Sequence, residues 1–316
     1  MVRTKEIILL VVILVVCQFN IMGEWKWNPE TGWINDKYNP RGQAQFLFSQ
    51  AKQIEQKGQY EEAFVVFQKI LENYPYTPEG KKALYLAAEC QYKLQNYYEA
   101  YLLYQKYLDD YPKNEISKEI LTKQYEIGSI LIRGKGKKRS VLGFRMLSSA
   151  PLGIEILEKL VETATYFKYA SDAQLTIANY YFKEEEYQEA QINYKKVIKN
   201  YPESIWCSFA QYQIAKCSLA QFQGKYNDSQ PLIQAREAFK KYTVNYPDGK
   251  EAKKVKEHQK KIHNLLAEKE LVTAKFYKKK GYPFSAKIYL QNIIENFKDT
   301  PSAFEAKVLL SEWYNL

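Results

Sequence analysis

The sequence predicts an all-α fold, a solenoid of about six helical hairpins closed by a C-terminal capping helix. One spacing recurs along the chain, in which an aromatic residue stands four residues after an alanine and eight before a proline. The aromatic residues in this position are Phe67, Tyr104, Tyr194 and Phe239. Outside the N-terminal region, no alternating apolar and polar segment of strand length competes with the helical spacing. A repeated helical unit favours a binding protein over an enzyme.

Each unit is interpreted as two antiparallel helices. In the first unit, Ala51 and Ala63 let the helices approach closely, and Phe67 fills the space beyond them. Pro75 ends the second helix because proline cannot continue a helix, and residues 58–60 form the turn between the two. This order of small, aromatic and proline sites resembles the tetratricopeptide repeat.

The spacing divides the chain into five segments. Residues 1–23 are expected to be a signal peptide, and residues 24–40 a Trp-rich extended leader. Residues 41–132 hold two hairpins and the first helix of the third. Residues 133–150 form a basic loop, and residues 151–316 hold the C-terminal repeats and the cap.

The first two units are 37 residues apart, and the position 37 residues before Ala190 identifies the third hairpin. This spacing places Gly153 at the alanine site and Leu157 at the aromatic site. The two helices are then expected at about 115–132 and 151–164. The loop between them is far longer than a tetratricopeptide turn, and such loops are often functional or disordered.

The last two hairpins depart from the pattern. Cys217 takes the small-residue site six residues early, which predicts a lengthened turn around residues 224–226. In the final hairpin, Leu290 stands at the aromatic site and Lys298 replaces the proline. Residues 301–316 are expected to form the capping helix.

The N-terminus has the features of a targeting segment. Its apolar run, Ile7–Cys17, would as a helix cover only about half of a bilayer core, which favours a signal peptide. The end of this run looks like a bacterial lipobox with Cys17 as the lipidated residue, although Val16 stands where a small residue is usual. Two alternatives stay open: ordinary cleavage after Gly23, and an uncleaved anchor.

The leader carries three tryptophans around a turn sequence. Trp25 and Trp27 would face the same side of an extended segment, and Trp33 follows the turn. These rings either cover the open end of the first repeat or present a docking surface. We favour the cap, because a solenoid must protect its ends.

Motifs of catalytic or metal-binding chemistry are missing from the sequence. His258 and His263 are five residues apart, which turns them to different sides of a helix. Cys207 and Cys217 would lie about 15 Å apart along one helix, too far for a disulfide. With no phosphate-binding glycine loop or nucleophile motif, the sequence predicts no enzyme, no cofactor and no metal.

Positive charge is concentrated in two places. The formal net charge is +10, yet Arg133–Arg139 carries five positive charges and no negative one, and Lys250–Lys280 carries eleven lysines against four acids. The basic loop is expected to contact anionic lipid headgroups or an acidic partner. A solvated loop is the alternative, and a solvated face is the interpretation favoured for Lys250–Lys280. The charged residues of the loop are Arg133, Lys135, Lys137, Lys138 and Arg139.

In a tetratricopeptide superhelix, the first helix of each hairpin lines a concave groove. Aromatic, lysine and amide side chains on these helices suit an extended peptide, with ring faces for its side chains and polar groups for its backbone. The alternative is that these tyrosines are only a compositional habit of the chain. The groove residues carried over from the repeat are Phe48, Lys52, Gln56, Tyr85, Glu89, Tyr92, Lys93, Leu175, Asn179, Phe182 and Gln211.

Three segments together resemble a known family. They are Lys52–Pro75, Tyr187–Ser204 and, most specifically, Ala267–Ala286, which begins AEKELVTAKFYKKKG. They are similar to the BamD (YfiO-like) family, the tetratricopeptide lipoproteins of bacterial outer-membrane β-barrel assembly. The resemblance covers roughly residues 40–310. The basic loop, the Trp-rich leader and the imperfect lipobox indicate a divergent member.

The resemblance implies a non-catalytic scaffold, lipid-anchored at the periplasmic face of the outer membrane or soluble in the periplasm. Its expected partners are an outer-membrane barrel assembly component and peptides of unfolded barrel proteins. Alternatives are a periplasmic tetratricopeptide adaptor in cell-envelope division or secretion, and a cell-wall-binding module that uses the leader. The secretion signal argues against a nucleic-acid partner.

Overall fold

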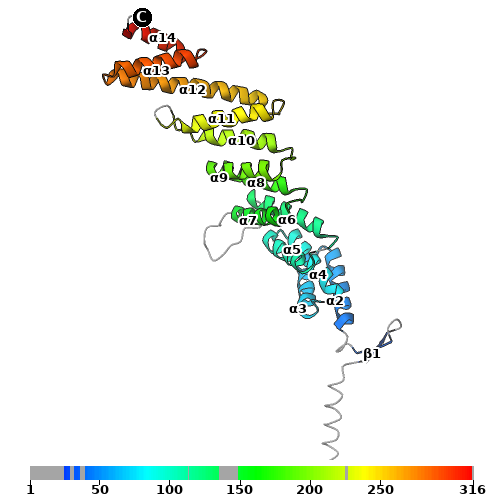
Figure 1. Cartoon of the computed structure of the whole chain (residues 1–316). Helices are drawn as coiled ribbons and strands as arrows, with labels where there is room; N and C mark the ends of the chain where they lie inside the picture. Colours follow the sequence, from blue (N-terminus) through cyan, green and yellow to red (C-terminus); the bar gives the residue numbers. More distant parts are fainter. Residues whose placement is uncertain are drawn as a thin grey trace, which may run out of the picture. The chain divides into compact units, whose positions relative to one another are not determined.

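The computed structural model describes residues 25–28, 32–35, 40–112, 114–134, 149–224 and 227–314. The chain divides into two compact units, Met1–Ile156 and Leu157–Leu316, and the boundary falls inside one helix. In each unit the helices follow one another in chain order as neighbouring layers (Figure 1).

Unit 1 begins with a short strand pair. β1 (Trp25–Asn28) and β2 (Gly32–Asn35) are antiparallel, with Trp27 opposite Trp33. The described part of the leader is therefore extended. Its role as a cap stays a prediction.

Helices make up the remainder of unit 1. They are α2 (Pro40–Gln56), α3 (Tyr60–Asn73), α4 (Pro78–Lys93), α5 (Tyr97–Asp110), α6 (Ser117–Ile132) and α7 (Ala150–Thr163), whose C-terminal half belongs to unit 2.

Unit 2 continues the same alternation. Its further helices are α8 (Ala170–Lys183), α9 (Tyr187–Asn200), α10 (Cys207–Ala220), α11 (Gln230–Asn245), α12 (Ala252–Lys279), α13 (Pro283–Asn296) and α14 (Pro301–Tyr314).

The predicted fold class, an all-α tetratricopeptide solenoid, is confirmed. The hairpins are α2–α3, α4–α5, α6–α7, α8–α9, α10–α11 and α12–α13, and α14 follows as the capping helix. Helices contact their partner within a hairpin, as in α2 with α3 and α8 with α9, and the neighbouring hairpin, as in α3 with α4 and α9 with α10. A hairpin buries its apolar face only against its neighbours, and this packing produces the repeat.

The repeated aromatic residue forms the centre of four of the six hairpins, and Leu157 and Leu290 take its place in the other two. Phe67, Tyr104, Tyr194 and Phe239 are all fully buried. The alanines four residues before them are equally buried, because they lie where the two helices approach most closely. The spacing read from the sequence is therefore the packing pattern of the core.

Four of the second helices end at a tyrosine that precedes a proline. Tyr74 is the C-terminal cap of α3, and its backbone N–H donates to the carbonyl of Ile70 at 2.7 Å. Tyr111, Tyr201 and Tyr246 cap α5, α9 and α11 in the same way. The following proline has no N–H and cannot extend the helix.

In the third hairpin, glycine brings two helices into close contact. A Cβ atom added to Gly153 of α7 would lie 2.6 Å from the carbonyl oxygen of Gly128 and 2.8 Å from the backbone nitrogen of Ile132 in α6. Gly153 occupies the predicted alanine site of the second helix, and α6 and α7 lie within one or two residues of their expected bounds. Most of the basic loop, residues 135–148, lies outside the described residues.

The fifth hairpin has the long link that its spacing predicts, whereas the length of α12 in the sixth hairpin was not predicted. Cys217 is fully buried at the small-residue site of α10, and residues 221–229 form the lengthened link to α11. Gly224 in this link has a φ of +106°, a conformation that favours glycine. α12 is 28 residues long, twice the length of α13, so α13 can cover only part of it.

Candidate peptide-binding faces of the two units

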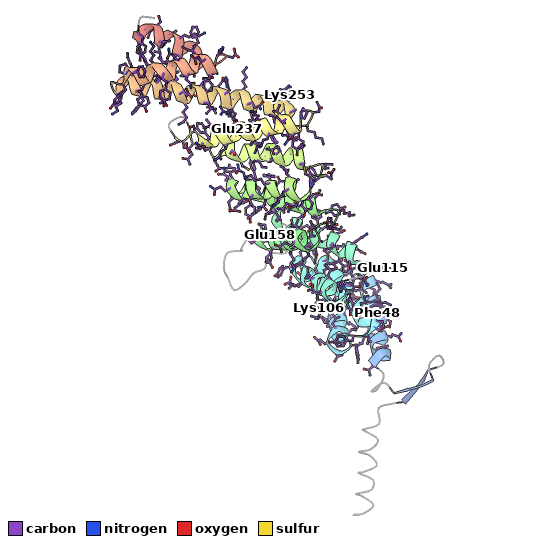
Figure 2. All side chains as sticks on the ribbon, in the orientation of Figure 1. Phe48, Lys106, Glu115, Glu158, Glu237 and Lys253 are labelled. Carbon is purple, nitrogen blue, oxygen red and sulfur yellow. The ribbon has the colours of Figure 1, made fainter. Side chains whose placement is uncertain are left out.

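The first helices of unit 1 carry aromatic rings beside lysines and acids. Phe48 lies on α2 (Figure 2). It is half-buried, and its ring centroid lies 6.0 Å from that of Phe67. The ammonium of Lys82 on α4, 34 residues later, stands 6.0 Å above the Phe48 ring. Lys52 pairs with Glu55 on its own helix at 2.7 Å. Rings and charges of α2 and α4 therefore meet on one face.

Two tyrosines of α4 bond to glutamates of α6 at the same interval of 34 residues. The Tyr85 hydroxyl donates to Oε1 of Glu119 at 2.8 Å, and the Tyr92 hydroxyl donates to Oε2 of Glu126 at 3.0 Å. Burial, together with the bond to Glu119, raises the pKa of Tyr85. Burial and the bond to Glu126 likewise raise the pKa of Tyr92. Both phenols therefore stay protonated as donors at neutral pH.

Lys123 of α6 lies between these two pairs. Its ammonium is 4.2 Å from the ring centroid of Tyr92 and 3.9 Å from a carboxylate oxygen of Glu89. Glu89 also accepts the hydroxyl hydrogen of the buried Tyr104. Since hydrogen bonds and a cation–π contact join the residues of this face, their side chains are held in defined positions.

Five of the predicted groove residues of unit 1 belong to this organised face: Phe48, Lys52, Tyr85, Glu89 and Tyr92. The other two, Gln56 and Lys93, are exposed near the C-terminal ends of α2 and α4. The structure brings Tyr85, Glu89 and Tyr92 together along α4. We keep all seven as a proposed binding face.

In unit 2, two predicted groove residues lie at an accessible face. Asn179 is exposed, and its Oδ1 accepts the hydroxyl hydrogen of Tyr194 at 2.6 Å. Phe182 is half-buried, with its ring 5.6 Å from that of Tyr187. The ammonium of Lys216, again 34 residues later, stands 4.9 Å from the Phe182 ring.

Two of the predicted groove residues are buried, and their prediction as groove residues is wrong. Leu175 is 7% exposed and packs in the core of unit 2, because its short aliphatic side chain cannot extend past its neighbours as a tyrosine does. Gln211 is 8% exposed, and its amide donates to the carbonyl of Ala238 at 3.1 Å. Neither side chain is available to a ligand.

The sequence analysis missed the residues that complete these faces. In unit 1 they lie on α4 and α6, and in unit 2 on α8, at the start of α10, along α10 and on α12. A search for complementary residues 34 apart would have found most of them, including Trp206, whose indole N–H donates to Asp172 at 3.1 Å. The missed residues are Lys82, Glu119, Lys123, Glu126, Asp172, Trp206, Tyr212, Lys216 and His258.

Tyr212 and His258 extend the unit 2 face onto α12. The Tyr212 hydroxyl lies 3.2 Å from Nε2 of His258. The imidazole stacks on Phe239 with 5.2 Å between ring centroids and an interplanar angle of 13°. His258 is therefore part of an aromatic cluster, and His263 lies elsewhere on α12, 4.9 Å from the Phe297 ring.

The remaining predicted site residues lie mostly outside the described part of the chain. Cys17 and the loop residues Lys135, Lys137, Lys138 and Arg139 are among them. Arg133 is described: it is exposed at the end of α6, and its Nε donates to the carbonyl of Ser129 at 3.0 Å. The roles assigned to the loop and to Cys17 stay predictions.

The cysteines of the described residues are buried free thiols: Cys90, Cys207 and Cys217. Burial raises the pKa of Cys90 and that of Cys217 to about 12, which keeps both as thiols. Within residues 40–314, as far as they are described, no three His, Cys, Asp or Glu side chains come together as a metal-binding group. The described helices include none that is long and apolar enough to span a bilayer.

Comparison with known proteins adds two family matches. A model described as outer membrane lipoprotein (YfiO) matches residues 149–316, and a tetratricopeptide repeat model matches residues 55–115. No curated protein matches the chain.

Several solved tetratricopeptide structures are similar to this chain. One from Parabacteroides merdae is 12% identical and has a TM-score of 0.34, covering 84% of this chain and 97% of its own. A thermophilic protein of Thermus thermophilus is 16% identical with a TM-score of 0.30, covering 68% and 98%. YrrB, described as having an unusual peptide-binding site, is 18% identical with a TM-score of 0.33, covering 67% and 90%.

The lipoprotein match spans more than half of the sequence and includes the block from Ala267 to Gly281 that carried the resemblance. With its tetratricopeptide fold, the chain is a protein-interaction scaffold of outer membrane assembly, and it belongs to the YfiO (BamD-like) family of outer membrane lipoproteins.

Proposed function

We propose that this chain is a non-catalytic periplasmic scaffold of outer-membrane β-barrel assembly. It binds domains of a barrel assembly component and holds peptides of unfolded barrel proteins on the first-helix face of unit 1. A lipid on Cys17 anchors it to the outer membrane. The family match supports a location at the outer membrane, and the tetratricopeptide fold supports a role in binding other proteins.

The observation that carries the peptide-binding role is the pair of tyrosine–glutamate bonds between α4 and α6. Tyr85 and Tyr92 are half-buried, so each ring keeps an accessible portion, while Glu119 and Glu126 hold the phenols in place. Rigid aromatic side chains lose little entropy on binding.

The chemistry of this face suits an extended peptide. Each carboxylate that accepts a tyrosine hydrogen has further lone pairs for peptide N–H groups. The rings offer apolar surface to the side chains of the peptide. An unfolded barrel strand presents both kinds of group along one segment, which makes it a fitting ligand for alternating rings and acceptors.

The central experiment identifies the partners. The full chain, extracted from membranes in mild detergent, is purified by affinity and its companions are identified by mass spectrometry. We expect an outer-membrane barrel assembly component to co-purify. If division or secretion proteins co-purify in its place, the adaptor role replaces this proposal.

The mass of the mature N-terminus tests the anchor. A lipidated Cys17 as first residue is the expected result. A mature chain that begins after Gly23 would instead make the protein soluble in the periplasm.

A second experiment tests the binding face. In the double variant Tyr85→Ala and Tyr92→Ala, we expect affinity for a synthetic barrel-strand peptide to fall about tenfold or more, with helical content unchanged. Tyr76→Ala is the matched control, because Tyr76 is almost fully exposed in the same unit. Loss of helical content in step with binding would show that Tyr85 and Tyr92 serve the core, and would remove this face from the proposal.

A further inference from the structure

Lys216 on α10 is a half-buried cation between two aromatic rings. Its ammonium lies 4.9 Å from the ring centroid of Phe182 and 5.8 Å from that of Tyr212. Among the described residues, no ion pair involves Lys216. Since no acidic side chain of the described residues pairs with it, its charge is available to a ligand.

Further positive charge surrounds the same place. The pKa of His258 is lowered, first by burial and then by the charges of Lys216, Lys261 and Lys254, while Glu257 opposes the effect. The local balance is therefore positive: three ammonium groups act on this imidazole against one carboxylate.

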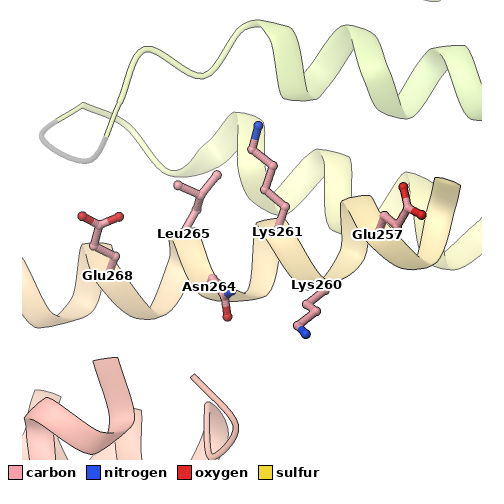
Figure 3. Close-up of a pocket in the computed structure, with 6 residues that line it drawn as sticks. All are labelled: Glu257, Lys260, Lys261, Asn264, Leu265 and Glu268. Atoms are coloured by element: carbon pink, nitrogen blue, oxygen red, sulfur yellow. The ribbon is translucent and has the colours of Figure 1, made fainter. Parts of the chain in front are cut away.

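An open hollow of about 390 Å³ lies on α12 beside this cluster. Figure 3 shows Lys261 and Leu265 of its lining on the same side of α12 as Glu257 and Glu268, with Lys260 pointing the other way. Leu265 also packs against the core of unit 2. Its lining holds two lysines and two glutamates, Glu257 and Glu268, so the hollow adds an apolar wall at Leu265 but no net positive charge.

We propose that the face made by α8, α10 and α12 binds an acidic segment of a partner polypeptide. A carboxylate of that segment pairs with Lys216, and adjoining apolar side chains lie against Phe182 and Leu265. This inference rests on the proposed scaffold function and names the chemistry of a second ligand-binding face, in unit 2.

The position of Lys216 favours a polypeptide over a membrane surface. A flat layer of lipid headgroups contacts side chains that protrude, and Lys216 is half-buried between two rings. A single carboxylate side chain on an extended segment can enter between the rings. The cation–π contacts fix the position of the ammonium group before the ligand binds, so little side-chain entropy is lost when the ion pair forms.

The test uses two fluorescent peptides of about twelve residues that share their aromatic and aliphatic positions and carry either Glu or Lys at the others. Binding to the full chain is measured by fluorescence polarisation at low salt. We expect the acidic peptide to bind and the basic one to bind at least about tenfold more weakly.

Variants of the full chain locate the site. Lys216→Gln should weaken the acidic peptide about five- to tenfold, and Lys216→Arg should retain most of its affinity. Lys195→Gln is the matched control, since it removes the same charge from an exposed position of α9. Helical content measured by circular dichroism confirms that each variant is folded.

Four results would overturn the inference: no binding of the acidic peptide, equal binding of both peptides, an affinity unchanged in Lys216→Gln, or binding of anionic phospholipid vesicles through Lys216 in place of the peptide. These failures are distinct from failure of the scaffold function. If peptide binding depends on Tyr85 and Tyr92 and not on Lys216, the scaffold function stands and only this second face is rejected.

Discussion

Tyr194 donates its hydroxyl hydrogen to Oδ1 of Asn179 at 2.6 Å, from the second helix of the fourth hairpin to the first. In the second hairpin, Tyr104 bonds to Glu89 in the same way. Both acceptors directly follow the small residue of the first helix. A buried tyrosine hydroxyl requires a hydrogen-bond acceptor. A tyrosine at the centre of a hairpin is therefore accompanied by an acceptor side chain directly after the small residue of the first helix.

This coupling can be measured with a double-mutant cycle. Asn179→Ala should lower the free energy of unfolding by about 1–3 kcal/mol, since it leaves the Tyr194 hydroxyl short of an acceptor. Tyr194→Phe should cost about 0.5–1.5 kcal/mol. With both changes the loss should be smaller than the sum, because no donor remains to be satisfied. Urea unfolding followed by circular dichroism provides the values, and strict additivity would show that the two groups do not interact.

The first hairpin provides the converse experiment. Its aromatic residue is Phe67, and the residue after its small site is Lys52, which cannot accept a hydrogen bond. Phe67→Tyr should therefore destabilise the protein by about 1–3 kcal/mol. Adding Lys52→Glu should recover much of this loss. A tyrosine that is tolerated without the glutamate would show that another acceptor lies within its reach.

The sequence predicted the hairpins well because their packing depends on residue size. Ala63, Phe67 and Pro75 determine where two helices approach, pack and end, so counting along the chain was enough to find the equivalent residues. Gly153 was found by the same counting, in a hairpin interrupted by a long loop. Residue size and spacing are local properties of the sequence, and the same pattern recurs in each repeat.

The candidate sites were harder to predict because they depend on how one hairpin lies against the next. The bond between Tyr85 and Glu119 joins different hairpins, and the spacing within a unit gives no information about it. Positions carried over from the repeat also ignore side-chain length. Leu175 and Tyr85 stand at equivalent places, yet the leucine is buried and the tyrosine is not.

Gly153 should not tolerate a methyl group. Gly153→Ala places Cβ against backbone atoms of α6, which cannot move as a flexible side chain does, so the two helices must separate. We expect a loss of about 1–3 kcal/mol in thermal or urea unfolding, although alanine is the better helix former. Lys159→Ala on the exposed side of α7 is the control and should change stability by less than about 0.5 kcal/mol. A stabilised Gly153→Ala variant would mean that α6 and α7 are more loosely packed.

His258 should make the protein less stable in mild acid. Its pKa is lowered by burial and by nearby lysines, so the unfolded chain binds this proton more readily than the folded one. Stability should fall as the pH drops below about 6.5 and through the folded pKa. The charged groups around it are Lys216 of α10 and Lys254, Glu257 and Lys261 of α12.

The variant His258→Phe tests this origin of the pH dependence, because a phenyl ring can still stack on Phe239. Urea midpoints measured between about pH 5 and pH 7.5 should change less with pH in the variant than in the parent protein. Equal slopes for the two proteins would assign the acid sensitivity to other groups.

Extra residues enter this chain inside hairpins and not between them. The two long connections, residues 133–149 and 221–229, both join the first helix of a hairpin to its second. The links from one hairpin to the next stay short, because they determine the register in which side chains such as Tyr85 and Glu119 meet. A reporter peptide spliced into the turn at 57–59 or 280–282 should therefore leave binding intact, whereas the same insertion at 111–116 should abolish it. Turns inside hairpins are thus the positions where a label or an insertion preserves the contacts between neighbouring hairpins.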